Sequence, residues 1–347
     1  MKVINITDNI IFCIILLILT SCGSETAEKN FGEIKDVSAE LIVIDELLQA
    51  NNIIKLEDYI VLQNGSEAVE DFYFVYSCPD LRFLYSFARR GRGPNEYIFP
   101  SVVKNTKGNV LAFKDHATDL IAFYRITDSS AELQMSMTFK SDDSRFFWEI
   151  NCIGDSLMLV KHQDYKTGAR ELWNPYDHVM VDSIPNTFEK LPSLMGKNYF
   201  TIFDDYQISA NCNRFAVAYT FIDRIELGRI NNGSITLESE IGVKSPPKFY
   251  NYGRREVKEF NIDKNIVYYE NVYSGEKYVY ALYSDDMLDN TEKNHSSVLE
   301  IYSWSGEPVC QLNLEYPIAY FAVDEEHNVI YGLNPNGFED KVLIYRY

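Results

Sequence analysis

Short runs of β-branched and aromatic residues, separated by Asn, Asp, Gly and Pro, recur from about residue 40 to the end of the chain. Such runs are typical of β-strands, and the residues between them are typical of turns. One kind of run appears six times, with starts that are 50, 47, 58, 63 and 51 residues apart. Its members are residues 59–62, 109–113, 156–160, 214–218, 277–282 and 328–333. We therefore expect six repeats of β-structure.

A second run of the same character follows most members of the first, as at residues 72–76 and 342–345. Repeats of roughly 40–50 residues with about four strands each are typical of a β-propeller. The sequence thus predicts an all-β fold, a six-bladed β-propeller over residues 38–347. The last repeat holds only three strands, so we expect an N-terminal strand at residues 40–44 to complete that blade and protect its edge. A pair of two-sheet sandwiches is the alternative.

The first residues follow a different pattern. Ten consecutive apolar residues, 10–19, come after a short polar start that contains Lys2. This order is typical of an export signal, and the run is too short to span a bilayer as a helix. It ends in LTSC, which resembles the lipobox of bacterial lipoproteins. The resemblance implies that residues 1–21 are a signal peptide and that Cys22 is acylated. An ordinary signal peptide followed by an incidental cysteine is the alternative.

Small and polar residues follow Cys22, and residues 22–37 are predicted to be a flexible tether. An acylated cysteine would attach the chain to a membrane through its lipid chains. We therefore expect a lipid-anchored protein of the cell envelope, at the outer membrane. The periplasmic and the surface face both stay open.

Composition excludes several classes of protein. The 347 residues carry 32 basic and 51 acidic side chains, a formal net charge of −19. Phosphate binding needs clustered Lys and Arg, so we expect no nucleic-acid partner. Hydrophobic residues make up 46%, too many for a disordered chain. Export permits disulfides, but the cysteines of the body are far apart and lack the paired spacing of a zinc site. We expect free, buried thiols at Cys78, Cys152, Cys212 and Cys310.

Between the first two repeats lies the sequence GRGPNEY, residues 91–97. It is similar to the Gly-x-Gly-Pro-x-Glu-aromatic signature of TolB-like six-bladed propeller lipoproteins, and more loosely of NHL-repeat propellers. The resemblance implies the propeller fold and assigns no activity. The glycines and proline predict a rigid crossover between blades, in which Glu96 accepts backbone N–H groups. A local group of basic side chains is a candidate site for a carboxylate or phosphate ligand, namely Arg89, Arg90 and Arg92.

The sequence GDSL at residues 154–157 matches the signature of GDSL-type esterases. On that hypothesis Ser156 would be the nucleophile, His327 the base and Asp324 its partner. The expected α/β helices and the Gly-x-Asn-Asp block are absent from the sequence, and both segments fall where a repeat needs a turn. We therefore assign no catalytic residue.

Metal and cofactor motifs are weak. Three histidines have acidic neighbours that could add ligands: His116 with Asp115 and Asp119, His162 with Asp164, and His178 with Asp177. None of these histidines has a second histidine four residues away, as in a metal-binding helix. The sequence also contains no calcium loop, Walker loop or dinucleotide-binding fingerprint. No metal residue and no cofactor is assigned, and a divalent ion stays open.

Aromatic residues make up 14% of the chain. Those expected in loops could contact a glycan, peptide or protein ligand: Trp173, Tyr176, Tyr199, Phe200, Phe249, Tyr250, Tyr252, Tyr268, Tyr269 and Tyr273. The sequence therefore predicts a non-enzymatic binding module that acts through propeller loops at the envelope. A metal-assisted lyase or hydrolase acting on glycan or peptide at the propeller channel is the alternative.

Overall fold

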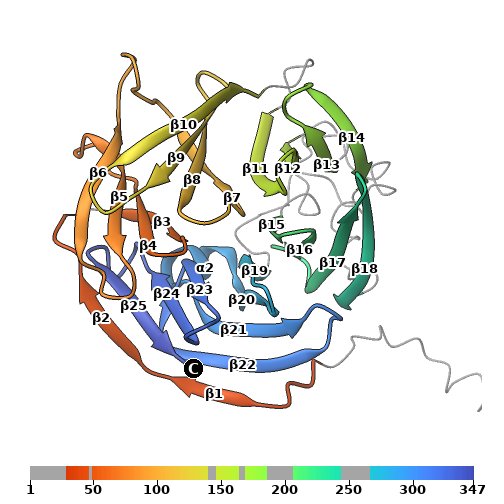
Figure 1. Ribbon diagram of the computed structural model, residues 1–347. Coiled ribbons are helices and arrows are strands. Elements are labelled where there is room, and N and C mark those ends of the chain that lie inside the picture. The colour runs from red at the N-terminus through yellow and green to blue at the C-terminus, as the bar shows by residue number, and fades with distance from the viewer. Residues whose placement is uncertain (1–28, 47–48, 140–145, 164–168, 186–205, 244–265) are drawn as a thin grey trace, which may run out of the picture.

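The computed structural model describes the chain from residue 29 onward, with internal gaps, as a ring of β-sheets (Figure 1). The described residues are 29–46, 49–139, 146–163, 169–185, 206–243 and 266–347. Cys22 and the expected signal peptide lie outside these residues, so both stay predictions.

The first three blades each contain four strands that follow one another along the chain. Blade one contains β3 (Ala50–Lys55), β4 (Tyr59–Asn64), β5 (Asp71–Ser77) and β6 (Phe83–Arg89). Blade two contains β7 (Pro100–Lys104), β8 (Val110–Asp115), β9 (Leu120–Ile126) and β10 (Ala131–Thr138). Blade three contains β11 (Phe146–Ile153), β12 (Leu157–Gln163), β13 (Arg170–Asn174) and β14 (Val179–Ile184).

The last three blades complete the ring and include strands from both ends of the described chain. Blade four contains β15 (Tyr206–Asn211), β16 (Arg214–Tyr219), β17 (Arg224–Asn231) and β18 (Ser234–Gly242). Blade five contains β19 (Ile266–Ser274), β20 (Tyr278–Met287), β21 (Ser296–Ser303), β22 (Pro308–Ile318) and β1 (Ile34–Val37). Blade six contains β23 (Tyr320–Asp324), β24 (Val329–Leu333), β25 (Lys341–Arg346) and β2 (Ala39–Val43).

The first strand of each blade lies nearest the centre of the ring, and the last lies at the rim (Figure 1). Blades two and three share one eight-stranded sheet, because β7 and β11 pair in parallel at Val103↔Ile150 and Lys104↔Asn151. The six recurring runs of the sequence become β4, β8, β12, β16, β20 and β24, the second strand of every blade. The predicted six-bladed fold is confirmed.

Six hydrophobic clusters hold the ring together, and each lies chiefly between two neighbouring blades. One cluster, for example, joins Ile60 and Phe74 of blade one to Tyr331 and Val342 of blade six. The other five join blades one to two, two to three, three to four, four to five, and five to six. Because every junction is packed, the core is a closed ring, and the alternative of two sandwiches is wrong.

Closure uses the N-terminal strand, as predicted. Strand β2 pairs antiparallel with β25, with Ile42 opposite Val342, and the Ile44 N–H donates to the Asp340 carbonyl at 2.7 Å. Strand β1, which the sequence analysis assigned to the tether, pairs in parallel with β22 as a fifth strand of blade five.

One short helix, α2 (Leu288–Asn294), interrupts blade five between β20 and β21, and the sequence pattern did not predict it. Within the described part of the chain, no helix is long and apolar enough to cross a membrane.

Candidate functional site

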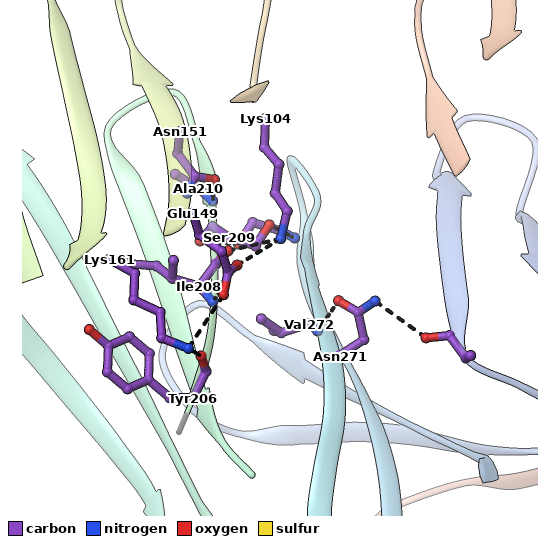
Figure 2. Close-up of polar contacts among 12 residues, drawn as sticks. Lys104, Glu149, Asn151, Lys161, Tyr206, Ile208, Ser209, Ala210, Asn271 and Val272 are labelled. Atoms are coloured by element: carbon purple, nitrogen blue, oxygen red, sulfur yellow. Dashed lines mark hydrogen bonds and ion pairs between the residues drawn. The ribbon is translucent and has the colours of Figure 1, made fainter. Parts of the chain in front are cut away.

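Polar side chains from neighbouring blades meet in one region of the ring, most of them on the first strand of a blade (Figure 2). Side chains alternate between the two faces of each strand, which explains their position. One face packs on the preceding blade, and the residues in between point toward the following blade. In β11, for instance, Ile150 and Phe147 are buried hydrophobics, whereas Glu149 and Asn151 are polar and contact the next blade. We call Lys104, Glu149 and Lys161 the channel cluster.

Within the channel cluster, two lysines share one carboxylate. The Lys104 ammonium lies 3.0 Å from Glu149 Oε2, and the Lys161 ammonium lies 3.7 Å from Glu149 Oε1. Lys161 also donates to the Tyr206 carbonyl oxygen and lies over the Tyr206 ring, 4.7 Å from its centroid. The Ile208 N–H donates to Glu149 at 3.3 Å. The two ammonium groups and the Ile208 N–H thus hold the Glu149 carboxylate in place.

Exposure separates the members of the channel cluster. The side chain of Lys104 is 32% exposed, whereas those of Glu149 and Lys161 are each 11% exposed. Lys104 donates to the Ile208 carbonyl at 3.2 Å besides Glu149, and an ammonium carries three protons. Lys104 is therefore the most exposed member of the cluster and the one that can offer a hydrogen bond to a ligand.

Hydrogen bonds continue this polar lining around the ring. The Ala210 N–H donates to Asn151 Oδ1 at 3.0 Å, and the Ser274 hydroxyl donates to the Ser209 carbonyl at 2.9 Å. On the next junction Asn271 Nδ2 donates to the Ala319 carbonyl at 3.4 Å (Figure 2). Because these bonds join different blades, the lining is rigid and holds its donors and acceptors in fixed positions.

A second polar group lies between blades five and six. His295, which follows α2, has Nδ1 3.1 Å from Glu270 Oε2 on β19 and Nε2 3.0 Å from Asn336 Nδ2. Burial raises the pKa of the Glu270 carboxyl. An imidazole held between a carboxylate and an amide has a fixed tautomer, which is how proton-transfer residues are oriented. No local sequence pattern indicates His295, because its partners are 25 and 41 residues away.

The crossover at residues 91–97 has the form that the sequence predicted. The Gly93 N–H donates to Glu96 Oε2 at 2.7 Å, and the Gly91 N–H donates to the Tyr97 carbonyl at 3.0 Å. Tyr97 is buried, and its hydroxyl lies 2.7 Å from that of Tyr124 on blade two. The segment therefore joins blade one firmly to blade two.

The described fold and this crossover agree with the comparisons. The sequence matches the family model of TolB-like 6-blade propeller-like proteins over residues 30–326. The chain belongs to that family. A solved member of the DUF4221 family from Bacteroides vulgatus is similar to this TolB-like propeller at 12% identity and a TM-score of 0.58, over 89% of this chain and 97% of that one.

A protein from Bacteroides fragilis has the same fold at 11% identity and a TM-score of 0.54, over 90% of this chain and 98% of that one. The comparison with curated proteins found no match. These similarities establish the fold and leave the activity of the TolB-like propeller to be argued from its own residues.

Replacing Gly91 by alanine in this TolB-like propeller should lower the free energy of unfolding by about 1–2 kcal/mol. Gly91 has a φ of 154°, and a Cβ there would overlap the Glu96 carboxylate that holds the Gly93 N–H. Urea unfolding measures the change. Gly32→Ala is the matched control, because a Cβ at Gly32 has no heavy atom within 4 Å. Equal effects of the two substitutions would contradict the role given to Gly91.

Arg89 and Arg90, two of the three arginines expected to bind an anion, contact different groups of blade one. Arg89 lies 2.8 Å from Glu70 on the surface. Arg90 donates to the carbonyls of Val69, Asn64 and Ser66, and its guanidinium lies over the ring of Phe72, at 3.9 Å. Arg92 is exposed. The guanidinium of Arg90 thus holds the loop before β5, and the anion site at Arg89, Arg90 and Arg92 stays a prediction.

The residues of the esterase hypothesis lie on separate blades. Ser156 is exposed in the turn between β11 and β12 of blade three. His327 lies 3.0 Å from Asp324 in the turn between β23 and β24 of blade six. Blades three and six face each other across the ring, so Ser156 cannot be activated by His327. Each motif has the structural role of a hairpin turn.

The described residues bring no three His, Cys, Asp or Glu side chains close enough to hold a metal ion. His116 and His178 lie on turns of different blades, and the side chain of His162 lies outside the described part. Asp115 instead anchors its own turn and the segment before β7: its Oδ1 accepts the Ala117 N–H at 3.2 Å and the Phe99 N–H at 2.9 Å. The turns that the sequence left open as possible metal ligands are therefore not brought together within the described residues.

His116 itself is a packed residue of blade two. Its Nε2 lies 2.6 Å from the Ser101 hydroxyl, and its ring packs against Phe99. Burial and, to a smaller extent, the charge of the Lys114 ammonium lower the pKa of His116 to about 4, against the opposing charges of Asp115 and Asp119.

This pKa predicts a pH dependence of stability. As the pH falls below about 6.5, the unfolded chain takes up a proton at position 116 that the folded chain accepts only near pH 4, so the free energy of unfolding decreases. His116→Gln should remove about 1–2 kcal/mol of that decrease, after allowance for screening at this partly exposed site. Urea midpoints of both proteins between pH 7 and pH 4 measure it; parallel pH curves would contradict the assignment.

The cysteines differ in part from expectation. All four are free, but only Cys310 is buried; Cys78 and Cys152 are half-buried and Cys212 is exposed in a turn. The expected loop aromatics also differ, because Trp173, Tyr268, Tyr269 and Tyr273 lie on strands. Tyr176 is exposed on a turn, and Tyr199, Phe200, Phe249, Tyr250 and Tyr252 lie outside the described residues.

Proposed function

We propose that this chain is a lipid-anchored envelope protein whose propeller is a non-enzymatic binding module, with its ligand in the central channel. The channel cluster carries the proposal, because it places a partly exposed ammonium beside a fixed carboxylate and a rigid polar lining. Ligand sites tend to lie in concave places with a few well-placed polar groups. A peptide or a glycan supplies the carboxylate, amide or hydroxyl groups that such a lining recognises.

The signal-like run at residues 10–19 and the lipobox-like cysteine support the anchor. Lys29, the first described residue, contacts Asp223 and Glu300 at the junction of blades four and five. Seven residue steps separate it from Cys22, about 25 Å when fully extended. An acylated Cys22 would therefore hold this junction close to the membrane.

The anchor is tested in cells that express the whole chain. Mass spectrometry of the N-terminal peptide should find acyl groups on Cys22, and Cys22→Ser should move the protein from the membrane fraction to the soluble fraction. Protease treatment of intact cells then distinguishes a surface from a periplasmic location. An unmodified Cys22 in membrane-associated protein would overturn the anchor.

The ligand is sought by thermal shift on the chain after Cys22, which keeps every described strand. A ligand of the folded state raises the melting temperature by mass action. We expect a peptide or glycan to stabilise the unmodified protein but not Lys104→Met. Lys107→Met is the matched control, since Lys107 is 71% exposed and pairs with Asp155 and not with the channel cluster. Equal responses of both variants would overturn the channel site.

The enzymatic alternative is favoured by one observation, the oriented imidazole of His295. It predicts turnover of a glycan or peptide that is lost in His295→Gln. A metal-assisted lyase or hydrolase further predicts a shift with divalent ions that a chelator reverses. Stabilisation by a ligand without turnover would favour the binding module.

A further inference from the structure

Lys29 enters a cage built by blades four and five, away from the channel cluster. Its ammonium lies 2.5 Å from Asp223 Oδ1, 2.8 Å from the Tyr269 hydroxyl and 3.3 Å from Glu300 Oε2. It also lies over two aromatic rings, 4.1 Å from the centroid of Tyr283 and 5.1 Å from that of Tyr269. Carboxylates and aromatic faces together attract a cation more strongly than either alone.

Hydrogen bonds among residues of the propeller also hold the cage carboxylate, besides the contact with Lys29. The Tyr302 hydroxyl donates to Glu300 Oε2 at 2.7 Å, and the Tyr269 hydroxyl lies 3.0 Å from the same oxygen. The side chain of Glu300 is only 3% exposed. Burial raises the pKa of Glu300, and the charge of Lys29 opposes that rise. A fixed, buried carboxylate of this kind requires a cation beside it.

The number of hydrogen-bond acceptors in the cage indicates which kind of cation fits it. A primary ammonium has three protons, and three acceptors surround it here, from Asp223, Tyr269 and Glu300. A quaternary ammonium cannot donate to them, and a planar guanidinium has a different donor geometry. The cage therefore fits the end of a lysine side chain.

The segment that delivers Lys29 is lightly attached. Strand β1 makes four register pairs with β22, at the rim of blade five. Val37 is its buried residue, whereas Ile34 is 61% exposed. Before it, Phe31 packs against Tyr302 with ring centroids 5.5 Å apart. Short edge strands with few buried contacts open more easily than the core. Release of the segment would free the cage and the edge of β22 together.

We propose that this cage is a binding site for a primary ammonium group, filled in cis by Lys29. When residues 29–37 leave, a lysine on an extended segment of a partner protein takes the same place, and its backbone pairs with β22. The occupant of the cage thus decides whether blade five is closed by its own chain or by a partner.

Chemical rescue tests the cage. Lys29→Ala should lower the melting temperature by at least about 2 °C, and millimolar n-butylammonium should restore part of that loss. The unmodified protein should not respond, and neither 1-butanol nor tetramethylammonium should rescue the variant. Adding Glu300→Gln should abolish the rescue. If Lys29→Ala does not fold alone, refolding with each compound gives the same readout. No rescue by n-butylammonium, or equal rescue by 1-butanol, would overturn the site.

Exchange in trans is tested with a fluorescent peptide of residues 27–38. It should bind Lys29→Ala at least about tenfold more tightly than the unmodified protein, whose own segment competes. A peptide with norleucine in place of Lys29 should lose this binding, because norleucine keeps the four side-chain carbons and removes the ammonium group. Equal binding of the two peptides, or binding of neither, would overturn the exchange of occupants.

Discussion

Replacing Glu226 by glutamine should lower the free energy of unfolding by about 3 kcal/mol. Glu226 is fully buried between blades three and four, together with Arg170 and Arg224. Its Oε2 lies 2.5 Å from Arg170 Nη1, and its Oε1 accepts a hydrogen bond from Arg224 Nε at 2.8 Å. The substitution would take away the carboxylate that lies between two buried guanidinium groups. Leaving a buried charge without its partner costs far more free energy than the ion pair contributes to stability.

The measurement is urea unfolding at neutral pH, with Glu238→Gln as the matched control. Glu238 pairs with Arg229 at 2.7 Å in the same blade, but both side chains are at least 35% exposed. We expect little change in the control, since water screens an exposed pair. In a double-mutant cycle, Arg170→Met should cost less in Glu226→Gln than alone, because the two side chains interact directly. Similar losses for Glu226→Gln and Glu238→Gln would contradict the buried network.

The spacing of hydrophobic runs was sufficient to predict the blades, because the second strand of every blade is such a run. Insertions in the surface loops change the spacing between runs but not their number. The runs at residues 109–113 and 214–218 became β8 and β16, each fully or largely buried between neighbours. The closing strand was predictable for a similar reason: the last repeat lacked a fourth strand, and β2 supplies it.

Side-chain partners were not predictable, because they arise from pairing between blades. Arg170 and Glu226 are 56 residues apart, and charged residues in strands normally face solvent. Lys104 and Glu149 meet only because β7 and β11 pair in parallel. Lys29 lies in a polar stretch that predicts a tether. No neighbouring residue in the sequence indicates its cage, because Asp223, Tyr269 and Glu300 are far away along the chain. By contrast, Glu96 lies in the same turn as Gly93, and this local contact could be predicted.

Proline at position 42 should lower the free energy of unfolding by about 3 kcal/mol, because it breaks the closure of blade six. The Ile44 N–H donates to the Asp340 carbonyl, and hydrogen-bonded pairs alternate along an antiparallel ladder. The register therefore makes Ile42 and Val342 the next bonded pair. Ile42→Pro removes that donor and frees the edge of β25, which becomes a site for pairing with other chains. Urea unfolding and light scattering measure the two effects.

Leu41→Pro is the matched control for the same strand. The N–H of Leu41 points away from β25, and β2 is the outermost strand of its sheet, so no ladder bond is lost. Ile42→Ala separates the loss of the side chain from the loss of the backbone donor. We expect Ile42→Pro to be clearly more destabilising than either. A larger effect of Leu41→Pro would mean that β2 pairs one residue out of this register, because a shift by one exchanges the inward and outward N–H groups.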